Sequence, residues 1–231
     1  MTRAATGRIA WPIVLEWGAK LLALVLLGGI IFLEVVSIRA WLGVAAVSPW
    51  RGWTRIVSDG SLAVFAAIVL AVYVVRRPAV RKAGGVLPRV AAVAGPIILP
   101  VALFFVKPDA TPARFVAGTV LSGVGHVLSI AAIAWLGRSF SVMPEARKLV
   151  TSGPYAIVRH PLYLSEACAS VGLVLLRFSW LSVAAFAVWT AAQFARARYE
   201  ERVLSAEFPE YAAYAARTPM LLPWPRRRRR A

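Results

Sequence analysis

Residues 136–166, LGRSFSVMPEARKLVTSGPYAIVRHPLYLSE, carry the most structural information because they place a polar stretch between two segments apolar enough to cross a bilayer. A second polar cluster, residues 199–202 (YEER), follows the last apolar segment. Ionisable side chains at a membrane edge are costly to hold and usually have a function. We therefore expect these two clusters to serve one site.

The composition is that of a membrane protein. Hydrophobic residues make up 60% of the 231 residues and the mean hydropathy is +0.70, whereas soluble domains are about 45–50% apolar. The net charge is +17, but the basic residues lie at the ends of apolar runs, where they face anionic lipid headgroups. This placement predicts contact with membrane phospholipids and no nucleic acid. The lone Cys168 allows no intrachain disulfide.

Six apolar runs approach the length that crosses about 30 Å of hydrocarbon. They are residues 15–38, 61–75, 89–106, 115–136, 162–176 and 180–195. The sequence thus predicts an all-α, polytopic membrane helix bundle of about six transmembrane helices. Residues 40–57, which contain three tryptophans, are expected to lie along the interface.

The distribution of Lys and Arg predicts the orientation. The two termini and the loops that would share their side carry 20 of these residues, against six on the other side. By the positive-inside rule, both termini face the cytoplasm, as in a multi-pass protein of a bacterial-type inner or plasma membrane. The loop before His160 and the segment after residue 195 would then meet at the same face.

The first polar cluster has the features of a turn followed by a helix start. Gly153 and Pro154 favour a turn, and Pro161 suits the first turn of the next helix. His160 would therefore lie at a helix N-terminus, where unpaired N–H groups bind carboxylates, and Arg159 supplies a bidentate donor to the same kind of group. The alternative is a basic membrane-edge loop that contacts phospholipid.

The second cluster lies on a helix that leaves the membrane. Residues 193–216 read as this helix, with Glu200 and Glu201 in its middle and a break near Pro209. A pair of Arg198 with Glu201 at i,i+3 is the alternative explanation for one of the two acids. The spacing of His and Cys residues predicts no metal site.

Three motifs together, LVTSGPYAIVRHPLYLSE, YEERVL and FPEYAAYAARTP, resemble the isoprenylcysteine carboxyl methyltransferase and phospholipid methyltransferase superfamily of integral membrane methyltransferases. The resemblance covers about residues 136–219 and implies an S-adenosylmethionine site at the cytoplasmic membrane edge. The implied cofactor-binding residues are Gly153, Pro154, Tyr155, Arg159, His160, Tyr163, Glu200 and Glu201. Arg159 and Glu201 are the expected catalytic residues.

The resemblance also implies roles. Arg159 and His160 would hold the methionine carboxylate, Tyr155 and Tyr163 would shape the adenosyl pocket, and one glutamate of the pair would bind the amino or ribose groups. The other would orient the acceptor or take its proton. The expected organisation is an N-terminal bundle of about four helices (residues 1–136), a methyltransferase core (137–219) and a basic tail (220–231).

Several residues stand outside the motif. Ser165 replaces a glycine common in the family, and its extra hydroxymethyl group is expected to narrow the cofactor's approach. Gly123 and Gly125 are expected to serve close helix packing, and His126 to form a hydrogen bond between helices. The role of Glu34 stays open.

Two other functions are compatible with the sequence. One is an NADPH-dependent membrane reductase resembling steroid 5-alpha-reductases, and the other is a non-enzymatic lipid-binding membrane protein. For the methyltransferase, the acceptor is lipophilic, but the sequence does not distinguish a carboxylate, an amine and a thiol. The oligomeric state and the function of the arginine tail also stay open.

Overall fold

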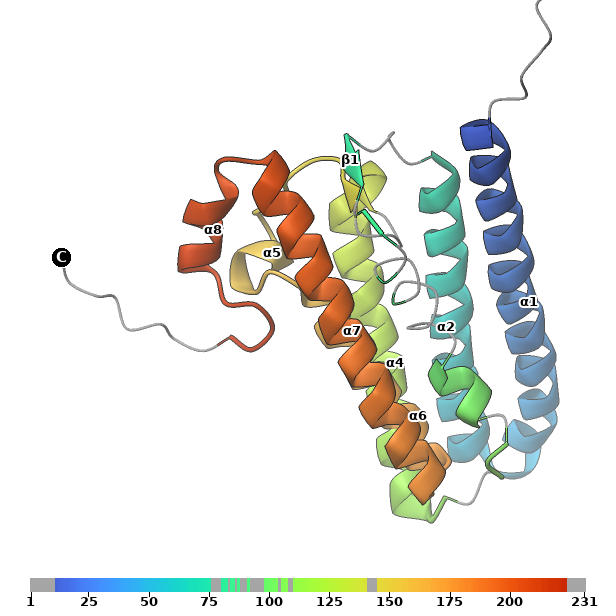
Figure 1. Cartoon of the computed structure of the whole chain (residues 1–231). Helices are drawn as coiled ribbons and strands as arrows, with labels where there is room; N and C mark the ends of the chain where they lie inside the picture. The colour runs from blue at the N-terminus through green and yellow to red at the C-terminus, as the bar shows by residue number, and fades with distance from the viewer. Residues whose placement is uncertain are drawn as a thin grey trace, which may run out of the picture.

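The structure is a computed structural model, and it describes residues 11–75, 80–82, 84–85, 87, 91, 98–103, 105–107, 110–140 and 145–223. Half of the predicted span at residues 89–106 lies outside these residues, as does the arginine tail. Long helices dominate the described part of the chain and stand side by side (Figure 1). The fold class is the predicted one, an all-α bundle.

The first two helices form an antiparallel pair. Helix α1 (Trp11–Val47) and helix α2 (Pro49–Val75) are separated by Ser48 alone. Gly52 permits the close approach, because a side chain there would overlap Ala45. Residues 40–57 therefore form the last turns of α1 and the first turns of α2, and the expected separate interfacial segment is not formed. The reason is that apolar residues continue each helix up to the break at Ser48 and Pro49.

The other long helices build the second part of the bundle. Helix α4 (Pro112–Leu136) begins at the cap Thr111, whose hydroxyl accepts from the Arg114 N–H at 3.4 Å. It packs on helix α6 (Pro161–Leu176), and helix α7 (Trp180–Glu207) runs back beside α6 (Figure 1). Gly125 faces the Ala169 backbone and leaves no room for a side chain, whereas Gly123 has open space around it. The packing prediction is thus confirmed for Gly125 alone.

Three of the described helices are long and apolar enough to cross a membrane. Their spanning segments are Leu24–Val47, Pro49–Val75 and Pro112–Ser139, and α6 is a shorter apolar helix. Many large apolar side chains on these helices point outward, such as Phe32 at 67% exposed and Val127 at 58%. A lipid environment accounts for this exposure. The chain is an integral membrane protein.

Polar groups inside the bundle find partners across helices. The Asp59 carboxylate accepts a hydrogen bond from the Ser37 hydroxyl at 2.7 Å and forms an ion pair with Arg55 at 3.0 Å. His126 Nδ1 lies 3.2 Å from the Ser61 hydroxyl. The predicted hydrogen bond of His126 between helices is therefore confirmed.

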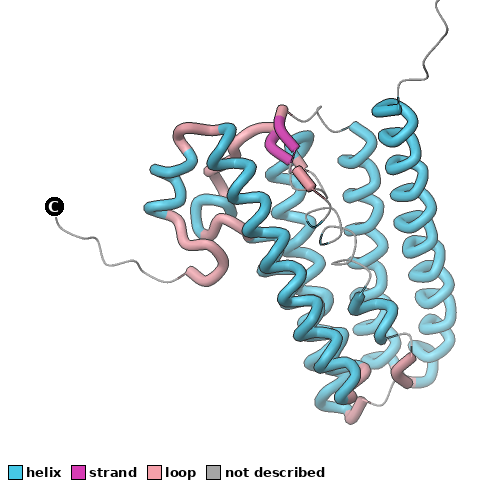
Figure 2. Tube along the Cα trace, viewed as in Figure 1, coloured by secondary structure: helices cyan, strands magenta, loops and turns pink. Residues whose placement is uncertain are grey.

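The short elements gather at one end of the bundle. Strands β1 (Arg81–Lys82) and β2 (Glu145–Ala146) pair antiparallel, and helices α5 (Pro154–Ile157) and α8 (Tyr211–Arg217) lie nearby with most of the described loops (Figure 2). The start of α1 and the end of α7 lie at this same end (Figure 1). This arrangement brings the two polar clusters of the sequence to one face.

Candidate active site

The turn that opens the site depends on Gly153. Its φ of +60° is in the left-handed region that favours glycine, and a side chain there would overlap the Trp135 ring. Pro154 then begins α5, His160 is the N-cap of α6, and Pro161 is the first residue of α6. The predicted turn and helix start are both confirmed.

The chain after α8 closes over this turn. The backbone N–H groups of Arg159 and His160 donate to the carbonyls of Pro219 (2.8 Å) and Met220 (3.1 Å). The Tyr214 hydroxyl donates to the Tyr155 carbonyl at 2.6 Å. Two N–H groups at the α6 start are thus already used within the chain, which leaves the side chains to carry the predicted binding of a carboxylate.

Side chains of the two polar clusters meet directly. Arg159 Nε lies 2.8 Å from Glu201 Oε1, as an ion pair without the alignment of a hydrogen bond. His160 Nε2 lies 3.3 Å from the same oxygen. Arg198 reaches the other oxygen of Glu201 only at 3.9 Å and is 57% exposed. The pair within the helix is therefore the weaker contact, and the turn is the main partner of Glu201.

The neighbouring acid contacts the first turns of α6. The Tyr163 hydroxyl donates to Glu200 Oε2 at 3.1 Å, and the Tyr163 ring packs against His160 with the ring centres 5.3 Å apart. Arg159 also donates from Nη1 to the Ala215 carbonyl at 2.9 Å. The structure thus brings all eight sequence-predicted site residues to the same end of the bundle.

The electrostatics of Glu201 favour its charged form. Burial alone would raise the pKa of this carboxyl group, but the hydrogen bond with His160 and the positive charge of Arg159 together hold the pKa below its ordinary value of 4.5. Glu201 is consequently an anion that binds cations and N–H donors. A depressed pKa makes it a poor proton acceptor at neutral pH.

Two buried hydroxyl groups at the site lack a partner. Tyr155 is 7% exposed and Tyr211 is 3% exposed, and neither hydroxyl has a hydrogen-bond partner among the described residues. Burial, followed by the charge of Glu200 for Tyr155 and of Glu201 for Tyr211, raises the pKa of both phenols above the usual range. Since an unsatisfied buried hydroxyl is costly, these two fit a ligand that supplies the missing hydrogen bonds.

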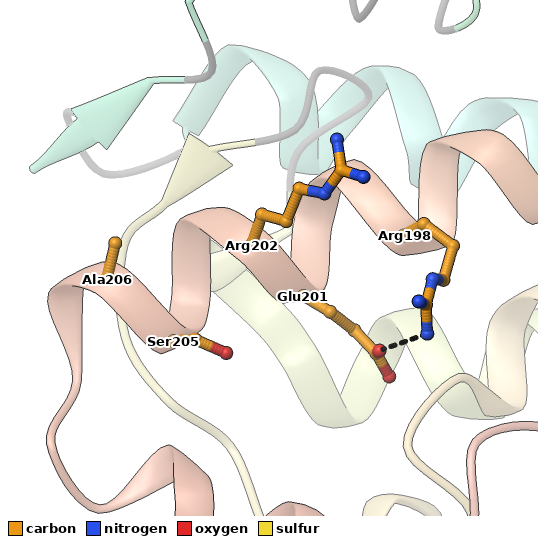
Figure 3. A pocket seen from close by; sticks show the side chains of 5 residues that line it. All are labelled: Arg198, Glu201, Arg202, Ser205 and Ala206. Atoms are coloured by element: carbon orange, nitrogen blue, oxygen red, sulfur yellow. Dashed lines mark ion pairs between the residues drawn. The ribbon is translucent and has the colours of Figure 1, made fainter.

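An open cavity of about 420 Å³ adjoins Glu201 on α7. Figure 3 shows it with the Glu201 side chain directed toward Arg198. The remaining lining residues are Arg202, Ser205 and Ala206. In this lining the Glu201 carboxylate accepts hydrogen bonds, the two guanidinium groups donate them, and Glu201 is the residue shared with the predicted site.

The sequence analysis did not identify Gln193 and Arg196, two polar residues of α7 that face α6. Gln193 Nε2 donates to Glu166 Oε2 at 2.6 Å, and Arg196 Nη1 donates to Gln193 Oε1 at 2.6 Å. Gln193 and Arg196 are 6% and 7% exposed. Their spacing to Glu200, at i+7 and i+4, puts all three on one helix face, and this was the signal that could have identified them.

Comparisons with known proteins give one family match and several partial matches to curated relatives. The phospholipid methyltransferase family matches residues 113–211. The cobalt-zinc-cadmium resistance protein CzcN of Cupriavidus metallidurans is 43% identical over 76 residues, which are 32% of this chain and 35% of that protein. The protein-S-isoprenylcysteine O-methyltransferase B of Arabidopsis thaliana is 38% identical over 114 residues, 46% of this chain and 58% of the relative.

A solved structure also matches. It is the eukaryotic intramembrane Ras methyltransferase, an isoprenylcysteine carboxyl methyltransferase, with 22% identity and a TM-score of 0.44 over 74% of this chain and 67% of that one. The chain spans between about a third and three fifths of the length of the curated relatives above. These matches support a relationship between residues 113–211 and the integral membrane methyltransferase superfamily.

Proposed function

We propose that the protein transfers a methyl group from S-adenosylmethionine to a lipophilic acceptor held in the membrane, with the cofactor reaching the site from the cytoplasm. The observation that carries this proposal is the meeting of Arg159, His160 and Glu201. Beside them lie the hydroxyls of Tyr155 and Tyr211, for which the described part of the chain supplies no partner. The family match over residues 113–211 supports the reaction class.

The residues present suit the polar groups of this cofactor. Arg159 and His160 would hold its carboxylate, Glu200 or Glu201 would bind its amino group or ribose, and Tyr155 and Tyr163 would line the adenosyl pocket. When bound, the cofactor supplies an electrophilic methyl group on a sulfonium. Alignment of the two reactants by such a site can lower a barrier by about 7–11 kcal/mol.

The chain's own contribution is positioning and exclusion of water. The segment that follows α8 closes the Arg159–His160 turn through backbone hydrogen bonds. On α8, the buried rings of Tyr211 and Tyr214 pack edge to face with their centres 5.9 Å apart.

We propose residues 137–219 as the methyltransferase core, with the site at the cytoplasmic face and both chain termini on that side.

Calorimetric titration of the purified protein with S-adenosylhomocysteine tests this function. The wild-type protein should bind, and His160→Ala and Glu201→Ala should each weaken binding by at least about tenfold, or about 1.4 kcal/mol. Glu210→Gln, an exposed acid at the start of α8, is the matched control and should bind as the wild type does. Unchanged affinity in both site variants would remove these residues from the cofactor site.

The same titration addresses the competing functions. Binding of NADPH in place of S-adenosylhomocysteine would favour a reductase, and binding of neither by folded protein would favour a lipid-binding role. The acceptor is identified by incubation with methyl-labelled S-adenosylmethionine and a native lipid extract, followed by analysis of the labelled product.

A further inference from the structure

Glu166 is the ionisable residue near the site that the proposed function leaves without a role. It follows Tyr163 by three residues on α6, so it lies on nearly the same helix face and about 4.5 Å deeper in the bundle. Its charge is close enough to contribute to the raised pKa of the Tyr155 hydroxyl. Glu166 therefore borders the site from the membrane side.

The carboxylate of Glu166 is held at one oxygen only. Oε2 accepts the hydrogen bond from Gln193 Nε2, and Gln193 is fixed in turn by Arg196, whose guanidinium lies 5.2 Å from the centre of the Tyr163 ring. Oε1 has no hydrogen-bond partner among the described residues. Because Gln193 fixes the other oxygen, Oε1 is oriented by its neighbours.

The other acids of the site contact the turn and the first turns of α6. Glu201 is bound by the Arg159–His160 turn, and Glu200 accepts from Tyr163 at one oxygen. An ionisable side chain at membrane depth is costly to keep and usually functional. Glu166, like Glu200, is held at one oxygen, but of the three acids it lies on the side from which a membrane-borne acceptor arrives.

We propose that Glu166 contacts the methyl acceptor, and that the acceptor is a proton-bearing nucleophile, a lipophilic amine or thiol, rather than a carboxylate. This inference rests on the proposed function. In the transfer step, the C–S bond of the sulfonium breaks and its electron pair stays on sulfur as a neutral thioether. The nucleophile forms the new bond to the methyl carbon, and its proton passes to Glu166 Oε1.

The second oxygen of Glu166 favours an acceptor that carries a proton. An amine or thiol offers a proton to Oε1, whereas an ionised carboxylate has none to offer. The nearby guanidinium of Arg196 donates to Gln193 and lies over Tyr163. The interaction with Oε1 is therefore favourable for one acceptor class and missing for the other.

Three probes with the same twelve-carbon chain test this inference: dodecylamine, dodecanethiol and dodecanoic acid, each mixed with methyl-labelled S-adenosylmethionine and wild-type protein. The amine or the thiol should be labelled at least about tenfold faster than the acid. Faster labelling of the acid, or labelling of none of the three, overturns the assignment. This arm requires no variant and therefore holds even if a substitution prevents folding.

The residue itself is tested with Glu166→Gln, which keeps the shape and can still accept from Gln193 but cannot take a proton. Labelling of the preferred probe should fall by at least about tenfold, whereas the affinity for S-adenosylhomocysteine should stay within about twofold of the wild type. Glu210→Gln is the matched control and should label at the wild-type rate.

The outcomes separate the two proposals. Unchanged labelling in Glu166→Gln overturns the role of Glu166 and leaves the proposed function standing. A loss of S-adenosylhomocysteine binding in Glu166→Gln assigns the residue to the cofactor and also overturns it. Failure of the wild-type protein to bind S-adenosylhomocysteine contradicts the proposed function itself.

Discussion

The α1–α2 pair and the α4–α6–α7 part of the bundle both enclose a carboxylate, but they satisfy their polar groups to different extents. In the first region, Asp59 is 3% exposed and is matched by Arg55 and Ser37. In the second, Glu201 is matched by Arg159 and His160, but the adjacent hydroxyls of Tyr155 and Tyr211 are not.

This difference separates a structural polar cluster from a binding site. Asp59, Arg55 and Ser37 meet one another, so a ligand would gain little by contacting these three side chains. At the end of α7, buried hydroxyl groups find no partner within the described ranges of the chain, and a bound ligand can offset the cost of this. The family match begins at residue 113, at the start of α4, and so covers only the second region.

The largest expected effect tests the structural role of the first region. Asp59→Ala leaves the positive charge of Arg55 without its partner, and breaking a buried ion pair costs about 3–5 kcal/mol. The free energy of unfolding in detergent should fall by this order, as measured by denaturant titration. The folded fraction should bind S-adenosylhomocysteine within about twofold of the wild type. A selective loss of binding with unchanged stability would place Asp59 in the functional machinery.

The next effect concerns the packing that holds the second region together. Gly125→Ala places a methyl group against the Ala169 backbone, and overpacking of this kind costs about 1–3 kcal/mol. Gly123→Ala is the matched control two residues away, where nothing lies near the new methyl group. Equal unfolding free energies for the two variants would contradict the close contact between α4 and α6.

A smaller effect follows from the charge of Glu201. Its pKa is held below 4.5 in the folded protein, mainly by His160 and Arg159 against the opposing effect of burial. Its contribution to stability is therefore complete above about pH 4.5 and is lost as the pH falls through the lower, folded-state pKa. Thermal unfolding between pH 7 and pH 3 should show this loss in the wild type and a reduced loss in Glu201→Gln. Parallel profiles would contradict the ion pair.

Much of the fold and the centre of the site could be predicted from the sequence because their signals are local. Gly153, Pro154 and Pro161 impose a turn and a helix start through their own backbone preferences, and long apolar runs predict helices in lipid. The convergence of His160 with Glu201 followed from topology, since the intervening hairpin returns the chain to the same face. These features need no knowledge of side-chain packing.

The remaining features depend on tertiary contacts that no local pattern encodes. The use of the Arg159 and His160 N–H groups by Pro219 and Met220 follows from the path of the chain after α8. The unsatisfied hydroxyl of Tyr211 likewise depends on how α8 packs. Residues 40–57 were expected to lie along the membrane interface because they contain three tryptophans. Tryptophan content indicates how deep a segment lies in the membrane, but it does not indicate the direction in which a helix runs.

The smallest effect concerns Ser165, which the sequence analysis expects to narrow the cofactor's approach. In the structure Ser165 is 4% exposed and its hydroxyl lies 2.8 Å from that of Ser129 on α4, so its side chain belongs to the helix interface. Hydrogen bonds between membrane helices contribute about 0.6 kcal/mol on average, and a double-mutant cycle with Ser165→Ala and Ser129→Ala should give a coupling free energy of unfolding of that order. The affinity for S-adenosylhomocysteine should not change in Ser165→Ala. Tighter binding in that variant would instead support a hydroxyl that restricts the cofactor, and would extend the site toward α4.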